Sequence, residues 1–181
     1  MNITIPVLTS NRLILQKIDS TYCSKKYVDS MNDLSIIQYL ESGGNYTLEI
    51  LGEFLKNVEI SSILFWAISL KENGKHIGNI KIDPINFKHG IGEYSILMFD
   101  KLEWGKGYAK EASILIINYC FVSLKLRKIV LGVVEDNKKA IELYLSLGFH
   151  VEGIYKNHGI YNGKLCNIFR MAFFNTNHEL Y

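Results

Sequence analysis

The spacing of hydrophobic and polar positions along the chain predicts alternating strands and helices. Alternation over Asn11–Ile18 indicates a first strand. Short apolar runs bounded by turn residues indicate the others. These further strands are expected at Leu64–Leu70, His76–Asp83, Gly92–Phe99, Lys128–Val134, Val151–Tyr155 and Cys166–Phe174. Asn73-Gly74 and Asn162-Gly163 are typical of the turns that join strands into hairpins, and Asp83-Pro84 is expected to end the strand before it.

Helical periodicity falls between these strands. Ala109–Leu124 carries apolar residues at i, i+3, i+4, i+7 and i+8, which is the stripe of a core-facing helix. Ser20–Gln38 and Leu48 to about Glu59 are also expected to be helical, the second capped by Thr47. A short helix after Asn137 should end at Gly148. This order predicts a mixed sheet in a layered α/β domain.

Composition limits the classes of protein. The chain has 181 residues, is 48% hydrophobic and carries a net charge of +2. A chain of this size can bury the core of one domain, and so small a charge gives no reason to expect nucleic acid binding. No apolar run reaches the roughly 18 residues of a membrane span. The three cysteines, Cys23, Cys120 and Cys166, are odd in number and far apart, and the five histidines lack ligand spacing. We therefore expect a cytoplasmic protein without disulfide or metal.

The stretch from Trp104 to Ala112 is the most informative in the chain. It predicts a glycine turn between the strand that ends at Phe99 and a helix. Glycine at 105 and 107 lets a ligand approach the backbone, and the first N–H groups of a helix have no partner within the helix. Lysines at 106 and 110 add positive charge. The stretch therefore predicts a site for a phosphorylated ligand.

Two common nucleotide motifs do not fit this stretch. A dinucleotide fingerprint needs a third small residue where Lys110 stands, and it belongs in the first βαβ unit. A Walker A loop needs a hydroxyl residue directly after its lysine, and Gly107 follows Lys106. Without further signals, a plain turn that starts a helix remains an equal alternative.

A second motif downstream decides between these alternatives. Trp104, Gly107 and Ala109 fall on the marked positions of Q/R-x-x-G-x-G/A, with tryptophan in place of the usual glutamine or arginine. The pattern N-x-x-A-x-x-L-Y-x-x-x-G-F follows at Asn137, Ala140, Leu143, Tyr144, Gly148 and Phe149. In both motifs the chain resembles the GNAT N-acetyltransferase superfamily, from about Thr9 to Phe174. The Trp-Gly-Lys-Gly-Tyr-Ala sequence resembles its branch of ribosomal-protein N-terminal acetyltransferases.

The resemblance implies a fold and a cosubstrate. The fold would be one acetyltransferase domain over residues 1–181, with its core at about 9–174. Its mixed, mostly antiparallel sheet would be flanked by helices, and two parallel strands would splay apart to hold acetyl-coenzyme A. The residues expected to contact coenzyme A are Leu97, Met98, Phe99, Trp104, Gly105, Lys106, Gly107, Tyr108, Ala109, Lys110 and Asn137. A backbone N–H in Leu97–Phe99 would stabilise the thioester oxygen.

Transfer of an acetyl group to an amine also needs a base and an acid. A primary aliphatic amine has a pKa of about 10.4, so less than one part in a thousand is neutral at pH 7. The resemblance favours Glu93 as the base and Tyr144 as the acid that reprotonates the leaving thiolate. A strand-start role for Glu93 stays open, and Glu135 and Asp136 are weaker candidates. Direct transfer in a ternary complex is favoured over an acyl-cysteine route.

The acceptor amine is the least determined feature. The Trp-Gly-Lys-Gly branch suggests a peptide or protein N-terminus, and Ile77–Asn86 resembles enzymes of bacterial surface-sugar synthesis, which favours an amino-sugar nucleotide. A polyamine ranks behind these two. It is suggested by Tyr161–Lys164 and by three acidic residues near the first helices, Glu41, Glu49 and Glu53. The family's pocket would include the loop Lys156–Lys164. A non-catalytic coenzyme A-binding module is a further alternative, and a homodimer through Phe173, Phe174 and Tyr181 is an expectation.

Overall fold

The computed structural model describes residues 4–41 and 44–176. The strands are Leu8–Thr9 (β1), Leu13–Lys17 (β2), Leu64–Leu70 (β3), His76–Asn86 (β4), Ile91–Met98 (β5), Lys128–Val134 (β6), His150–Tyr161 (β7) and Lys164–Phe174 (β8). The α-helices are Lys25–Met31 (α1), Leu34–Ile37 (α2), Leu48–Ile60 (α3), Tyr108–Asn118 (α4) and Lys138–Leu147 (α5). Short 3-10 turns lie at Ser20–Tyr22 and Lys101–Glu103, and a π-helical turn at Tyr119–Ser123.

The strands hydrogen-bond in the order β1-β2-β3-β4-β5-β6-β8-β7. The β5–β6 pair is parallel, whereas β1–β2, β2–β3, β6–β8 and β7–β8 are antiparallel. The predicted mixed, mostly antiparallel sheet is thereby confirmed. In the described part of the chain, no helix is long and apolar enough to cross a membrane.

The chain forms two compact units. The described residues up to Lys81 make the first unit together with Ile96–Ala112. Ile82–Ser95 and the described residues from Ser113 onward make the second. Strands β4 and β5 and helix α4 therefore contribute to both units, and whether they act as one domain stays a prediction.

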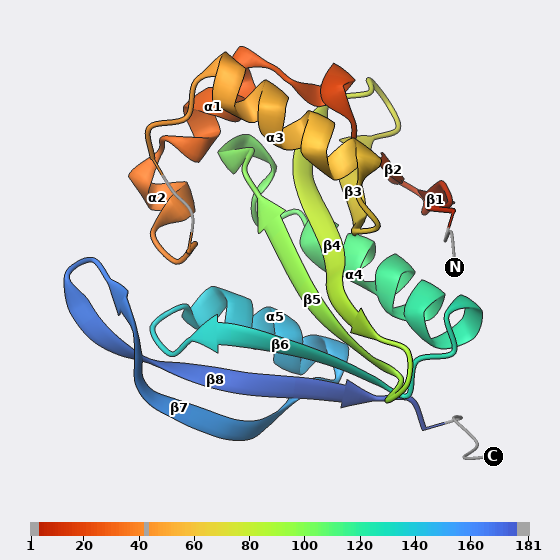
Figure 1. Ribbon diagram of the computed structural model, residues 1–181, viewed down its shortest axis with the longest axis vertical. Coiled ribbons are helices and arrows are strands. Elements are labelled where there is room, and N and C mark those ends of the chain that lie inside the picture. The colour runs from red at the N-terminus through yellow and green to blue at the C-terminus, as the bar shows by residue number, and fades with distance from the viewer. Residues whose placement is uncertain (1–3, 42–43, 177–181) are drawn as a thin grey trace. The chain divides into compact units, whose positions relative to one another are not determined.

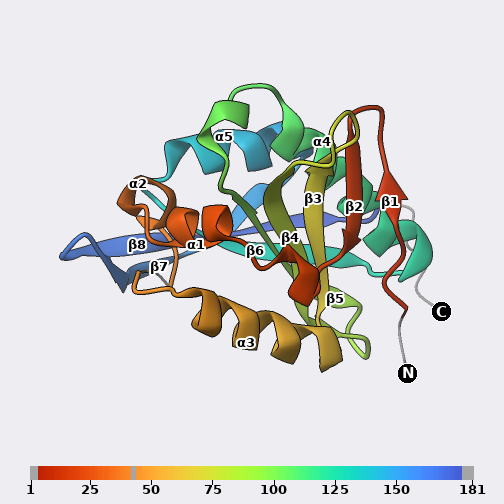
Figure 2. The same cartoon turned by 90° about the horizontal axis from the view of Figure 1, so that it is seen from above.

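In the first unit, β1, β2 and β3 lie side by side (Figure 2). Helix α3 is capped by Thr47, whose hydroxyl accepts a hydrogen bond from the N–H of Ile50, as predicted. Helices α1 and α3 share one core, so the segments that lie before β3 cover the end of β5. Its buried residues are Ile18, Tyr27, Val28, Met31, Leu51, Leu55, Val58, Ala67 and Phe99.

The predicted single helix over Ser20–Gln38 is wrong. Three short side chains each accept a hydrogen bond from a following N–H and start a new turn there. They are Asp19 before the 3-10 turn, Ser24 before α1 and Asp33 before α2. Helical periodicity alone does not reveal these repeated starts, because the apolar residues keep nearly the same spacing.

In the second unit, α5 is capped by Asn137 at its start and by Gly148 at its end, as predicted. The Asn137 side chain accepts from the N–H of Ala140, and Gly148 has a φ of 100°. Strand β6 pairs with β5 only over Lys128–Val130, although it continues to Val134 on β8. A parallel pair that separates after three residues matches the expected splay of the two motif strands.

The last two strands differ from their prediction. Figure 1 shows them as a long hairpin, and β7 continues to Tyr161, so most of the expected loop Lys156–Lys164 is strand. Register shifts leave a bulge between Tyr155 and Gly159. Phe173 is half-buried and packs against Phe121 and Phe149, whereas Phe174 is exposed. Tyr181 lies outside the described residues.

Strand β4 also runs further than predicted, through a cis Asp83–Pro84 bond to Asn86. Near its start, the half-buried His76 ring packs edge-on against Tyr22, Tyr27 and Phe99. Its Nε2 lies 3.0 Å from the Gly78 carbonyl oxygen and 2.8 Å from Asn79 Oδ1. Both are acceptors, so Nε2 carries the proton of the neutral ring. Burial lowers the pKa of His76 to about 4, although these two hydrogen bonds oppose the shift.

We expect His76 to make stability depend on pH. The unfolded chain takes up a proton near the ordinary pKa of 6.5, whereas the folded chain does so only near 4. The free energy of unfolding should therefore fall as the pH drops from 6.5 to 4, by about 3 kcal/mol at most. Urea unfolding at a series of pH values should show a flatter dependence for His76→Gln than for the wild type. Equal slopes would contradict this assignment.

Candidate active site

The loop between β5 and α4 has the backbone that its glycines predict. Gly105 and Gly107 have φ values of 75° and 83°, in the left-handed region that favours glycine. A Cβ at Gly105 would meet no atom within 4 Å, and one at Gly107 would meet only Arg12 Nη2, at 3.6 Å. The surface of the loop above these glycines is therefore open, and a ligand can approach the backbone.

One side of this loop is held by Arg12, which the sequence analysis did not single out. Its Nη1 donates to the Lys106 carbonyl oxygen at 2.9 Å, and its Nε donates to Glu111 Oε2 at 2.7 Å. The guanidinium carbon also lies 4.4 Å from the centre of the Tyr108 ring. Arg12 therefore fixes the end of the loop and the first turn of α4 together.

Glu111 holds Arg12 in this position. Its Oε1 accepts from the Ser10 hydroxyl at 2.6 Å and from the Arg12 N–H at 3.1 Å. Burial alone would raise the pKa of Glu111, but the hydrogen bonds from Ser10 and Arg12 outweigh it and hold the pKa below its usual value. Glu111 thus remains ionised and keeps Arg12 in place.

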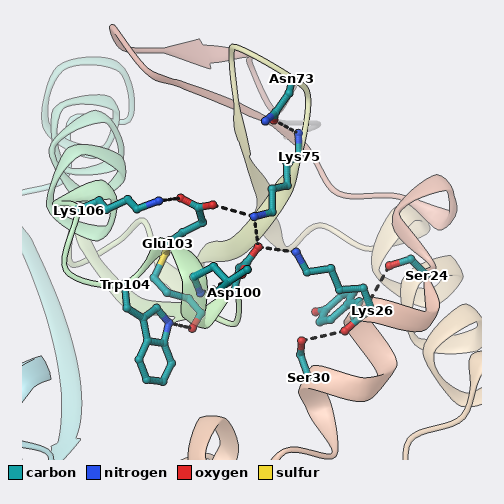
Figure 3. Close-up of polar contacts among 12 residues, drawn as sticks. Ser24, Lys26, Ser30, Asn73, Lys75, Asp100, Glu103, Trp104 and Lys106 are labelled. Atoms are coloured by element: carbon teal, nitrogen blue, oxygen red, sulfur yellow. Dashed lines mark hydrogen bonds and ion pairs between the residues drawn. The ribbon is translucent and has the colours of Figure 1, made fainter.

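The other side of the loop is held by an ion-pair network in the first unit (Figure 3). Asp100 is 4% exposed and Glu103 8% exposed. Lys75 bridges them, with its Nζ 2.8 Å from Asp100 Oδ2 and 2.7 Å from Glu103 Oε1. Lys26 makes a second ion pair with Asp100, and Lys106 Nζ lies 2.8 Å from Glu103 Oε2. Three lysines thus hold two carboxylates, which leaves a surplus of one positive charge.

The ammonium groups keep both carboxylates ionised. Burial alone would raise the pKa of Asp100, but hydrogen bonds from Lys26 and Lys75 reverse the effect and lower it. Hydrogen bonds from Lys106 and Lys75 lower the pKa of Glu103, and Glu103 raises the pKa of Lys106 in return. Lys106 is therefore a cation that its ion pair with Glu103 holds at the loop.

The remaining predicted cofactor residues of the first unit surround this loop. Trp104 is 41% exposed, and its Nε1 donates to the Met98 carbonyl oxygen at 2.9 Å, so it holds the end of β5. Phe99 is buried against Tyr27, and its N–H donates to Ile77. Lys110 is exposed in the first turn of α4. Open glycines, a helix start and a surplus of cations fit the phosphates of coenzyme A.

Tyr144 is held in an aromatic cluster of the second unit. It is 7% exposed, and its ring lies edge-on to Tyr94, with 5.9 Å between the ring centres, and beside Phe149. Burial raises the pKa of Tyr144 to about 12, so the phenol is protonated at neutral pH. No described residue hydrogen-bonds its hydroxyl, whereas the Tyr94 hydroxyl is paired with Ser113 at 2.7 Å. Tyr144 is therefore a rigid, protonated phenol, and its raised pKa makes it a weaker acid than a free tyrosine.

Glu93 lies on β5 in the same unit. Its Oε1 accepts from Arg170 Nη1 at 2.9 Å, and the two side chains are 36% and 25% exposed. Among the described residues, no other one binds the Glu93 carboxylate. Glu93 is the predicted base, and its second carboxylate oxygen, Oε2, therefore remains available.

The weaker candidates have structural partners. Glu135 accepts from the side-chain amide of Asn167 at 2.8 Å, and the N–H of Asn157 in the β7 bulge donates to the same Asn167. Burial raises the pKa of the Cys120 thiol to about 12, which makes it a poor nucleophile. Within the described ranges, no three His, Cys, Asp or Glu residues are grouped to hold a metal ion.

Comparisons with known proteins agree with these arrangements. Residues 12–150 match the family described as acetyltransferase (GNAT) domain. The chain is 30% identical to spermidine N(1)-acetyltransferase of Escherichia coli over 151 residues, which are 82% of this chain and 80% of that protein.

Solved structures show the same fold. Spermidine N-acetyltransferase from Vibrio cholerae, in complex with CoA and spermine, aligns with a TM-score of 0.83 at 24% identity and covers 93% of this chain and 99% of that one. Ribosomal-protein-S5-alanine acetyltransferase from Vibrio fischeri aligns with a TM-score of 0.83 at 18% identity and covers 97% of this chain and 100% of that one.

The loop assignment predicts a specific effect of Gly107→Val. A branched side chain at a φ of 83° strains the backbone and covers the open surface of the loop. The KM for acetyl-coenzyme A should rise at least about tenfold, equal to about 1.4 kcal/mol. Gly44→Val is the matched control, because Gly44 has a φ of 82° and open space. Both variants should lose thermal stability, and a similar KM in both would contradict the assignment.

Proposed function

The chain belongs to the GNAT acetyltransferase family and is an acetyl-coenzyme A-dependent N-acetyltransferase, and we propose that its acceptor is a polyamine of the spermidine type. The observation that most supports this acceptor is the match to a spermidine acetyltransferase over four fifths of both chains. The acceptors ranked first from the sequence, an amino-sugar nucleotide and a peptide N-terminus, have no relative of comparable identity and coverage among these matches.

Coenzyme A would be held chiefly by the loop between β5 and α4. We assign its phosphates to the backbone of Gly105–Ala109 and to Lys106 and Lys110. Leu97, Met98, Phe99, Trp104, Tyr108 and Asn137 complete the proposed contacts. Because the Phe99 N–H already donates to Ile77, the oxygen-stabilising N–H is assigned to Leu97 or Met98. The cosubstrate supplies the acetyl thioester.

Tyr144 is the proposed general acid. Its hydroxyl is protonated at neutral pH, its ring is fixed by Tyr94 and Phe149, and no described side chain competes for its proton. A positioned acid of this kind donates to the thiolate as it leaves. The C–S bond breaks as the amine nitrogen bonds the acetyl carbon, and the Tyr144 phenolate then takes up the second proton that this nitrogen loses on becoming an amide.

Glu93 is the proposed general base. Its carboxylate would accept a proton from the acceptor ammonium, directly or through one water, and so supply the neutral amine that attacks. The same negative charge attracts a cationic acceptor. Two more carboxylates, Glu49 and Glu53, are exposed one turn apart on α3, and we propose that they favour a polycation.

The three cysteines also support a reducing compartment. Cys23, Cys120 and Cys166 are all free thiols. We therefore propose a cytoplasmic location, and assembly as a homodimer remains an expectation from the family.

Tyr144→Phe should separate chemistry from folding. Removal of the hydroxyl should lower kcat about 100-fold or more and leave the affinity for acetyl-coenzyme A nearly unchanged. Tyr94→Phe is the matched control, because it deletes a hydroxyl bonded to Ser113 and should cost about 1 kcal/mol of stability with kcat preserved. Steady-state kinetics and thermal unfolding of both variants provide the test. An unchanged kcat in Tyr144→Phe would remove it from the acid role.

The acceptor is tested by thiol release from acetyl-coenzyme A with three classes of amine. Spermidine and spermine should support turnover, whereas amino-sugar nucleotides and N-terminal peptides should not. Titration with acetyl-coenzyme A alone checks that the protein is competent to bind. Turnover confined to another class would refute the polyamine proposal and leave the acetyltransferase assignment intact.

A further inference from the structure

Arg170 reaches across a whole strand to meet Glu93. In the sheet, Glu93 on β5 lies opposite Val130 on β6, and Arg170 on β8 lies opposite Gly132 of the same β6. The Arg170 side chain therefore passes over β6 at Gly132. A Cβ on Gly132 would lie 2.9 Å from Arg170 Nη1, closer than such atoms approach. Gly132 is thus required to leave this path open.

The contact places a permanent cation on the proposed base. The guanidinium stays charged at every pH relevant to proteins, and its Nη1 lies 2.9 Å from Glu93 Oε1. Its carbon also lies 5.9 Å from the centre of the Tyr155 ring on β7. Glu93 thus already holds a positive charge at the place where an acceptor ammonium would bind.

We propose that Arg170 is a specificity-determining residue that acts as an internal competitor for cationic acceptors. A polyamine must share Glu93 with the guanidinium and approach a like charge, which weakens its binding. An acceptor with a carboxylate or phosphate beside its amine would instead gain from the same guanidinium. Arg170 thereby limits how tightly polycations bind at Glu93. The inference rests on the proposed role of Glu93.

Arg170→Met tests the charge. The variant should lower the KM for spermidine about three- to fivefold, the range of a partly exposed ion pair, and leave the KM for acetyl-coenzyme A unchanged. Lys128→Met is the control, because Lys128 lies on the neighbouring strand β6 and pairs with Glu152 rather than Glu93. It removes one positive charge and should leave the KM for spermidine unchanged. A merely structural arginine would give a raised or unaltered KM.

Gly132→Ala tests the geometry at constant charge. The added methyl should displace the flexible guanidinium from its path and lower the KM for spermidine by about twofold, in the direction of Arg170→Met. Thermal unfolding of each variant shows whether it is folded. A spermidine KM that stays equal to or above the wild-type value in both variants overturns the inference.

Glu93→Gln separates this inference from the proposed function. If Glu93→Gln keeps the wild-type kcat, the assignment of the base fails. If it loses kcat while Arg170→Met leaves KM unchanged, only the role of Arg170 fails. If the acceptor screen identifies an amine with an anionic group, Arg170→Met should raise the KM for that amine. If Arg170→Met changes the KM in the same way for anionic and cationic acceptors, the inference is overturned.

Discussion

The ionised state of two carboxylates with little exposed surface, Asp100 and Glu103, is the constraint on which the path of the loop between β5 and α4 depends. A carboxylate with little access to water is disfavoured without a partner, so these groups require cations to stay where they are. Lys75 comes from the turn before β4 and Lys26 from α1. The same electrostatic requirement therefore joins three segments that are distant in sequence. The loop between β5 and α4 keeps its path because its carboxylates cannot leave their lysines.

The residues that hold the site and the residues proposed to act in it differ in one respect. Arg12, Lys75 and Tyr94 have their polar groups bound to other parts of the protein. The Tyr144 hydroxyl has no hydrogen-bond partner in the described chain, and one oxygen of Glu93 is likewise unbound there. Paired groups give rigidity, and an unpaired group fixed by packing can meet a substrate without first breaking a bond.

The sequence predicted those elements whose signals are local. Strands β3 and β6 occur at their predicted residues, because unbroken apolar runs between turns leave few alternatives. The caps of α5 were equally readable from Asn137 and Gly148. The helix over Ser20–Gln38 failed because short polar side chains start new turns within it. Arg12 and Arg170 could not be assigned, since each acts on a partner at least 77 positions away and shares no motif with it.

The ion pair between Lys106 and Glu103 explains how a lysine in an exposed loop can serve the proposed phosphate site. A free lysine loses up to about 2 kcal/mol of rotamer entropy when a ligand immobilises it. The ion pair with Glu103 already restricts Lys106, so part of that loss occurs on folding rather than on binding. Glu103 does not cancel the local charge, because Lys75 and Lys26 bring the network to a surplus of one cation. Asp100 and Glu103 therefore help to order the cation that is proposed to meet the phosphates, while the loop keeps a net positive charge.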